Sequence, residues 1–399
     1  MAVVACTSKG LLSVGFSLLW GQLTFNPYSG YGIGLPHLGA ATAGMGMGRL
    51  ACIGLETPLP EQPAHSAHLR SVQADFSGYG RRIRLQTPTQ VAHFGTGGLQ
   101  NLLLSFSRGR GWGFAMGLLP QYLQGYASAP QSLGNGAFFS ERAEGMLTLA
   151  YLQLALRWHH LALGYQFGYL WGTYERRRTI QPPVQPLPDY LITQTQLGGP
   201  QHRFGLLWQD SLGPWTLQLS LTYTLPTTLS QENLYTFQKN FNYTAILLDT
   251  FALTAGRWGL GTSLRGGIGI GRRKWWLGLE GSYHTPPQRW EAQGLVPRPA
   301  KPSWDARGGL VFVPDRRSPK FYQRLHYQFG VLAAQPPYTD LRWYGLTFGL
   351  GWQFPKLPNL VFLSLEYGWL PDSYVHETYL QVGIGILFRE LWFIPPRID

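Results

Sequence analysis

The segment from Pro214 to Pro226 constrains the fold of this chain more than any other part of the sequence. Its apolar side chains occupy every second position, and polar side chains occupy the positions between them. The apolar set is Trp215, Leu217, Leu219, Leu221, Tyr223 and Leu225, and the polar set is Thr216, Gln218, Ser220, Thr222 and Thr224. A β-strand points successive side chains to opposite faces, so this segment predicts a strand between two different environments. Its apolar face covers about ten residues, the length that a tilted strand needs to cross a bilayer.

The same alternation recurs along most of the chain. It is clearest in residues 161–173, 344–354, 361–369 and 380–388, where large apolar residues alternate with small or polar ones. The other candidate strands are residues 69–78, 99–106, 113–124, 145–156, 202–208, 260–270, 275–283, 304–313 and 323–333. Together they make 14 strands if residues 227–257 only extend their neighbours, whereas one inserted strand would make 15 and two would make 16. Bacterial membrane barrels have even strand numbers, so we predict an all-β fold: a transmembrane antiparallel β-barrel of 14 strands.

The composition also favours a membrane barrel. Only 13% of the 399 residues are charged, while aromatic residues make up 14% and glycine contributes 50 residues. So few charges cannot cover the surface of a soluble protein of this size. The mean hydropathy of −0.10 excludes a bundle of membrane-spanning helices. Short connections such as 158–160 alternate with long ones such as 176–201, as expected for periplasmic turns and extracellular loops.

The N-terminal residues do not alternate and predict segments of a different kind. Residues 1–21 contain a short apolar run after Lys9 and are predicted to be a signal peptide. Residues 22–66 are rich in small residues and cannot build a core of their own, so we predict a hatch inside the lumen. The barrel would then occupy residues 67–388, and residues 389–399 would form a periplasmic tail. The hatch residues that stand out are Tyr28, Tyr31, Gly32, Gly34, Gly44, Gly46, Gly48 and Pro63.

Several polar residues fall on the inner faces of the predicted strands. As candidates for lining a solute path we single out Gln166, Gln218, Gln328, Gln353, Glu366, Gln381 and Arg324. In the other interpretation the glutamines only solvate a wet lumen, and Glu366 pairs with an inward arginine such as Arg324.

No motif predicts catalysis, a metal site or a cofactor. Glu280, Ser282 and His284 share one strand face. Residues two apart in a strand are about 7 Å apart, which is too far for a direct hydrogen bond between Ser282 and His284. The formal charge of +12 comes from basic clusters in expected turns, where they would meet outer-membrane lipid or lipopolysaccharide. No basic helix or groove motif accompanies them, so nucleic acid is not an expected partner.

Motifs near both ends of the chain resemble those of FadL/TodX-type outer-membrane transport proteins of the Bacteroidota. They are Asn26-Pro27-Tyr28-Ser29-Gly30-Tyr31-Gly32-Ile33-Gly34, Ala41-Thr42-Ala43-Gly44-Met45-Gly46, Gln62-Pro63-Ala64, Glu377-Thr378-Tyr379-Leu380, Leu391-Trp392-Phe393-Ile394 and Arg397-Ile398-Asp399. Gln62 departs from the asparagine that is usual in that family. The resemblance implies a 14-stranded barrel with a luminal hatch in the outer membrane of a Gram-negative bacterium. It also implies passive uptake of hydrophobic molecules such as long-chain fatty acids or aromatic hydrocarbons.

Two functions are consistent with this sequence. The first is a monomeric channel for hydrophobic or amphipathic small molecules, entered through an apolar vestibule built from residues 182–191, 229–241 and 286–296. The alternative is a non-conducting barrel that binds envelope proteins as a subunit of an outer-membrane secretion or assembly complex. Co-purification with other envelope proteins would favour the alternative, and bound hydrophobic ligand would favour the channel.

Overall fold

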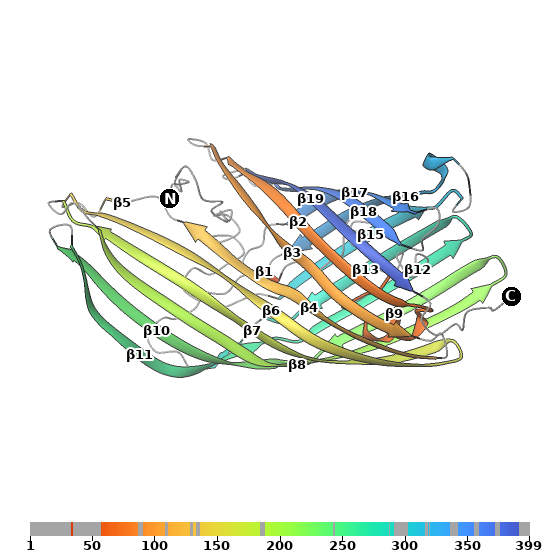
Figure 1. Ribbon diagram of the computed structural model, residues 1–399, viewed down its shortest axis with the longest axis horizontal. Coiled ribbons are helices and arrows are strands. Elements are labelled where there is room, and N and C mark those ends of the chain that lie inside the picture. Colours follow the sequence, from red (N-terminus) through yellow and green to blue (C-terminus); the bar gives the residue numbers. More distant parts are fainter. Residues whose placement is uncertain are drawn as a thin grey trace.

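The structure of this protein is a computed structural model that describes most of the chain. The described residues are 33–34, 57–86, 91–107, 111–127, 131–132, 136–183, 188–241, 244–286, 288–290, 302–315, 318, 320–335, 342–354, 359–371 and 376–390. They form an elongated antiparallel barrel whose last strand pairs with the first long one (Figure 1). Within these residues, no helix has the length and apolar character needed to cross a membrane.

The barrel wall contains 14 strands, two of which are interrupted. The uninterrupted strands are β2 (Val72–Gln86), β3 (Val91–Ser107), β4 (Trp112–Ala127), β6 (Phe138–Trp158), β7 (Leu161–Gln181), β8 (Asp189–Leu212), β13 (Trp275–His284), β15 (Ser303–Phe312), β16 (Leu325–Gln335), β17 (Trp343–Gln353), β18 (Leu360–Leu370) and β19 (His376–Glu390). The interrupted strands are β9 (Trp215–Thr224) with β10 (Thr227–Phe241), and β11 (Thr244–Leu260) with β12 (Ser263–Arg272). Short elements complete the described chain: β1 (Ile33–Gly34), β5 (Gln131–Ser132), β14 (Gln288–Trp290), and the 3₁₀ turns η3 (Pro63–His68) and η4 (Phe321–Gln323).

Residues 227–257 extend neighbouring strands, which confirms the predicted number of 14. One end of β8 pairs with β9 and the other end pairs with β10, so β9 and β10 continue one another along the same neighbour. In the same way β12 pairs with β9, and β11 pairs with β10. Pro226 lies at the first interruption. Proline has no amide hydrogen and cannot donate to a strand ladder, which accounts for the break.

The alternation of side chains places apolar residues outside the barrel, as predicted. In β7 the exposed residues are Leu163, Tyr165, Phe167, Tyr169 and Trp171, and the buried residues between them include Ala162, Gly164, Gln166, Gly168 and Leu170. The other strands repeat this arrangement, so a belt of exposed apolar side chains surrounds the barrel. Tight turns at residues 159–160, 213–214 and 273–274 join strands at one end, which we call the short-turn end.

At the opposite end, five strands are longer than the alternation predicted. Strands β6, β7 and β8 contain 21, 21 and 24 residues. Residues 176–201, which we expected to form a loop, lie mostly within β7 and β8, and residues 229–241 of the expected vestibule belong to β10. Figure 1 shows β6, β7, β8, β10 and β11 reaching beyond the rest of the barrel. Alternation fails there because both faces of a strand that has left hydrocarbon can carry polar side chains.

Candidate functional site

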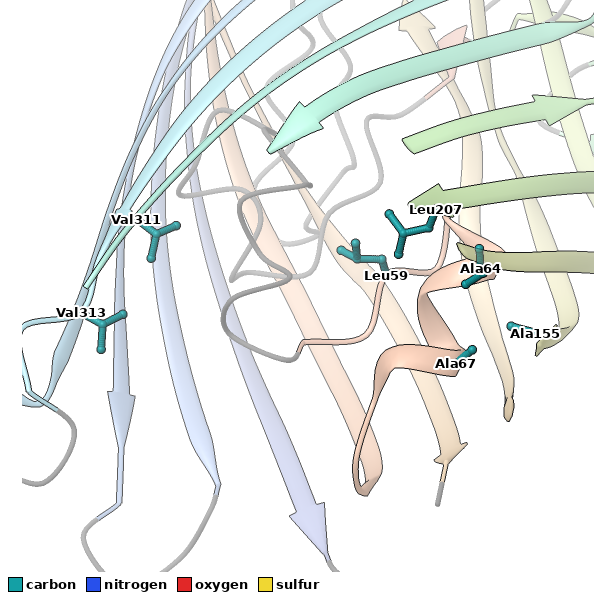
Figure 2. Close-up of a cluster of buried hydrophobic side chains, with 8 residues drawn as sticks. Leu59, Ala64, Ala67, Ala155, Leu207, Val311 and Val313 are labelled. Carbon is teal, nitrogen blue, oxygen red and sulfur yellow. The ribbon is translucent and has the colours of Figure 1, made fainter. Parts of the chain in front are cut away.

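Residues 57–68, which we call the luminal segment, are held inside the barrel near its short-turn end. All of these side chains except that of His68 are buried. The turn η3 packs against the inner faces of β3, β4, β6, β7 and β8. Leu59, Ala64 and Ala67 form an apolar cluster with wall residues that include Ala155 and Leu207 (Figure 2). Small side chains therefore let this segment lie close to the wall, although the boundary predicted for the hatch as a domain stays a prediction.

Glycines of the wall form the seat of η3. A Cβ atom at Gly164 of β7 would overlap the backbone of η3 at Pro63 and Ala64. A Cβ atom at Gly113 of β4 would overlap the backbone of Ser66, and one at Gly205 of β8 would overlap Gln62. At Gly164 and Gly113 a glycine is required because backbone approaches backbone without space for a side chain, whereas Gly205 makes room for the Gln62 side chain.

Side-chain hydrogen bonds fix the segment further. The Gln62 amide donates to the carbonyl oxygen of Leu206 at 3.0 Å and accepts from the Thr222 hydroxyl at 3.2 Å. The backbone oxygen of Pro60 accepts from Gln153 at 2.6 Å and from Gln166 at 3.3 Å. Gln166, which we predicted to line a solute path, therefore binds the luminal segment.

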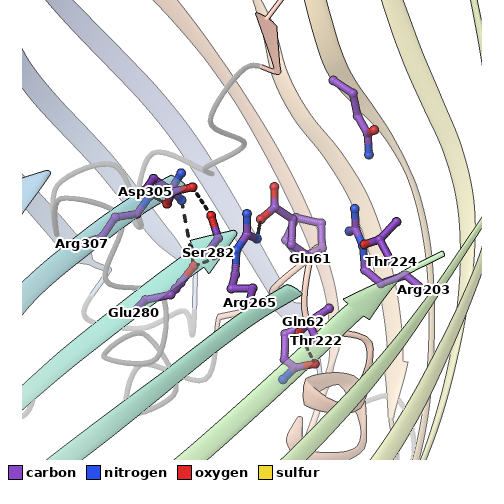
Figure 3. A network of polar contacts seen from close by, with 12 residues as sticks. Glu61, Gln62, Arg203, Thr222, Thr224, Arg265, Glu280, Ser282, Asp305 and Arg307 are labelled. Carbon is purple, nitrogen blue, oxygen red and sulfur yellow. Dashed lines mark hydrogen bonds and ion pairs between the residues drawn. The ribbon is translucent and has the colours of Figure 1, made fainter. Parts of the chain in front are cut away.

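A chain of buried charges joins the segment to another part of the wall (Figure 3). Arg265 of β12 pairs with Glu61 of the segment, and its Nε lies 3.1 Å from Glu280 Oε1 of β13. Arg307 of β15 lies 4.0 Å from the same Glu280 oxygen and 2.5 Å from Asp305 Oδ1. The five side chains are at most 17% exposed. A buried network of this kind stabilises one arrangement, because losing a partner leaves an uncompensated charge.

Ser282 and His284 form a direct hydrogen bond, which contradicts our prediction. The Ser282 Oγ lies 3.0 Å from His284 Nε2, because the imidazole ring reaches back along the strand. Asp305, opposite Ser282 on β15, accepts from the Ser282 hydroxyl and lies 3.6 Å from the same nitrogen. In a catalytic triad the nucleophile and the acid bind different nitrogens of the histidine. Here both contact one nitrogen, so the three residues extend the charge network and do not have triad geometry.

The other predicted inner-face residues lie at separate places in the barrel. Gln218 and Gln328 are fully buried, and neither amide has a hydrogen-bond partner among the described residues. Gln381 accepts two hydrogen bonds from Arg81, at 2.9 Å and 2.6 Å. Gln353 is half-buried at the end of β17. These positions belong to several different strands, and their role in lining a solute path stays a prediction.

The proposed pairing of Glu366 with Arg324 is wrong. Glu366 accepts a hydrogen bond from the Tyr379 hydroxyl at 2.5 Å. Arg324 precedes β16, near the short-turn end. Glu366 of β18 pairs with Thr347 of β17, and Thr347 pairs with Gly330 in the middle of β16. The two residues therefore lie at different heights in the wall.

Of the hatch residues, two lie within the described chain. Gly34 belongs to β1 and pairs with Tyr122 of β4, and Pro63 begins η3. Proline suits the first turn of a helix, where its missing amide hydrogen costs nothing. Tyr28, Tyr31, Gly32, Gly44, Gly46 and Gly48 lie outside the described residues.

Acidification is expected to weaken the docking of the luminal segment. Burial lowers the pKa of His65 from 6.5 to about 4, against the opposing effect of its hydrogen bond to the Thr57 carbonyl. Burial also lowers the pKa of His68 to about 3, helped by the nearby charges of His65 and Arg157. Below pH 6.5 a released segment would therefore bind protons that the docked segment excludes.

Hydrogen exchange of residues 57–68, corrected for the intrinsic effect of pH, measures this change. Protection of the backbone amides of this segment against exchange should fall as the pH decreases from 6.5 toward 4. The double variant His65→Gln/His68→Gln should lose most of this dependence, and His160→Gln in an exposed turn should keep it. An unchanged profile in the double variant would contradict the assignment to these histidines.

The closed 14-stranded architecture is that of TodX-like outer-membrane barrels. The toluene transporter TodX of Pseudomonas putida shares 14% identity with a TM-score of 0.60, over 90% of this chain and 99% of that chain. The monoaromatic hydrocarbon channel CymD shares 14% identity with a TM-score of 0.53, over 90% of this chain and 98% of that chain. The first is described as a transporter and the second as a channel, and at this identity the likeness establishes only the fold.

The sequence family is more specific than the fold. The family model described as BamG matches residues 10–399, so this chain belongs to the BamG family. A comparison with curated proteins finds no match. The resemblance to FadL/TodX-type proteins is therefore confirmed for the fold, while the family is BamG.

Proposed function

We propose that this protein is a subunit of the BAM complex of the outer membrane, in which it binds partner proteins and does not conduct solutes. The match of the BamG family model to residues 10–399 is the observation that carries this proposal. It supports the second of the two functions that the sequence predicted, and it supports passive uptake of hydrophobic molecules less well.

The interior of the barrel is consistent with a closed lumen. The luminal segment is fixed by a glycine seat on one part of the wall and by buried ion pairs on another. A hydrophobic solute passing this level would have to displace the segment or lie against Glu61, Arg265 and Glu280. Covering charged groups with apolar surface is unfavourable unless each charge keeps its partner. The luminal segment therefore acts in this proposal as a permanent part of the barrel.

The long strands provide a surface for partners. Residues 174–181 of β7 and 189–198 of β8 lie beyond the apolar belt and carry arginine, threonine and glutamine side chains. Arg177, for example, lies over the ring of Tyr190 at 3.9 Å. An extended sheet that presents arginine and tyrosine side chains beyond the apolar belt is suited to bind the soluble domain of an envelope protein.

Purification from the native membrane in mild detergent tests the proposal. We expect a tagged chain to retain other proteins of the barrel-assembly complex in constant ratio. Liposomes that contain this chain should take up toluene and fatty acid no faster than empty liposomes, while TodX liposomes serve as the positive control. A chain that purifies without partners and accelerates uptake would support the channel and exclude the proposal.

A further inference from the structure

Among the residues that the structure describes, β3 and β4 pair with one another along only part of their length. These strands pair over only six residue positions, from Leu102 with Leu118 to Ser107 with Gly113. Beyond them, residues 91–101 of β3 still pair with β2, and residues 119–127 of β4 still pair with β6. Figure 1 shows the upper ends of β3 and β4 diverging, in agreement with this pairing. We call the region between these two edges the seam.

Local features of both strands explain where the seam begins. The register of β2 with β3 shifts at Gln100, and the register of β4 with β6 shifts at Gln121. Pro120 precedes the second shift and cannot donate a backbone hydrogen bond. Bulges bend a strand and end its pairing, so two bulges at one level direct β3 and β4 away from each other.

The seam lies within the apolar belt. On one side, the exposed side chain of Val382 is level with Gly80, which is level with Gly97 of β3. The exposed Arg82, one step further along β2, marks the limit of the belt on this side. On the other side, the exposed side chain of Met146 is level with Leu123 of β4. Strand edges between these levels and the last β3–β4 pair therefore face hydrocarbon.

Backbone groups at these edges need hydrogen-bonding partners. An amide or carbonyl group without a hydrogen-bonding partner is strongly unfavourable in hydrocarbon, because no water is present to replace the partner. An alkyl chain cannot satisfy such groups, but an added strand can. The chain itself demonstrates this, because Ile33 and Gly34 of β1 pair with Leu123 and Tyr122 on the edge of β4. Among the described residues, β1 covers only these two positions of the seam.

We infer that the seam is an acceptor site for a β-strand of a partner protein. This inference rests on the proposed function, since it names the surface through which a BAM-complex subunit would hold another envelope polypeptide. The occupant is an extended segment that alternates apolar residues toward lipid with small or polar residues toward the lumen, as the wall strands do. It adds to the edge of β3, or replaces β1 on the edge of β4.

Site-specific photo-cross-linking in intact cells tests the inference. A benzoylphenylalanine residue replaces Leu99, at the seam, or Leu104, in the paired part of the same strand. The two side chains are 36% and 37% exposed, so they are matched in access. Side chains on neighbouring strands approach to about 5 Å, so a strand added at the seam would lie within reach of position 99. Each variant is first shown to keep the heat-modifiable migration of a folded barrel.

The expected result is a protein adduct at position 99 that is absent at position 104. Mass spectrometry should locate the cross-link in an extended segment of a second envelope protein, and Ile33→Pro, which removes β1 pairing, should increase the adduct. Adducts at both positions, adducts with lipid alone, or adducts only within this chain would overturn the inference. If assembly proteins still co-purify while position 99 forms no protein adduct, the seam is wrong and the proposed function stands. If assembly proteins do not co-purify and position 99 forms no protein adduct, the proposed function fails as well.

Discussion

Replacing Arg265 with alanine is expected to release the luminal segment from the wall. The variant leaves Glu61 and Glu280 without their shared cation, and these side chains are only 6% and 3% exposed. Removing one partner of a buried ion pair costs about 3–5 kcal/mol, because the remaining charge stays desolvated. The strand ladders do not include this side chain, so the loss should appear as undocking and not as unfolding of the barrel.

Hydrogen exchange of residues 57–68 in detergent measures the release. Arg272→Ala is the matched control on the same strand, because its side chain is exposed and lies over the ring of Trp215, away from the luminal segment. We expect that control to change protection by no more than about 1 kcal/mol. In Arg265→Ala/Glu61→Gln the second change removes one of the two carboxylates that Arg265 paired, so the double variant should regain part of the protection. Full protection in Arg265→Ala would show that the ion pairs do not hold the segment.

The architecture of the barrel could be predicted because a single physical rule determines it. Wherever a strand separates lipid from lumen, the sequence must alternate, and β7, β9, β17, β18 and β19 all do. The rule stops applying where strands leave the membrane. For this reason the outer halves of β7 and β8 were expected to be loops, although residues 176–181 and 189–201 continue as strands.

The candidate site was predicted less completely, because inner-face charges find their partners across the lumen. Arg265 occupies the inner face of β12, where its neighbours are glycines. A charged residue among glycines was the signal in the sequence that could have indicated a functional site. Its partner Glu61 lies 204 residues away in sequence, and strand periodicity gives no information about that distance. Glu366 was recognised as an inner-face acid, but its hydrogen bond to Tyr379 depends on the height of each residue in the wall. The seam had a clearer signal, since Pro120 within a strand pattern indicates an edge or a bulge.

Replacing Gly164 with alanine is expected to displace η3 by a second and independent route. The added methyl group would overlap the backbone of Pro63 and Ala64. A backbone cannot rotate away as a side chain can, so the overlap must be relieved by moving the turn. Overpacking of this kind costs typically about 1–3 kcal/mol, and the hydrogen bonds of Gln62 would be lost with the movement. Protection of residues 57–68 should therefore fall, and leak of solutes from liposomes should increase.

Gly80→Ala on β2 provides the control, because nothing lies within 4 Å of a Cβ atom at that position. It should leave both exchange and leak unchanged. Gly164 contacts η3 from β7, whereas Arg265 binds Glu61 from β12, so the two variants perturb different contacts of one segment. If the segment docks as a unit, either variant alone should expose all of residues 57–68, and combining them should add little. If each variant exposes only its own side, the luminal segment consists of two separately held parts, and the lumen stays closed until both are released.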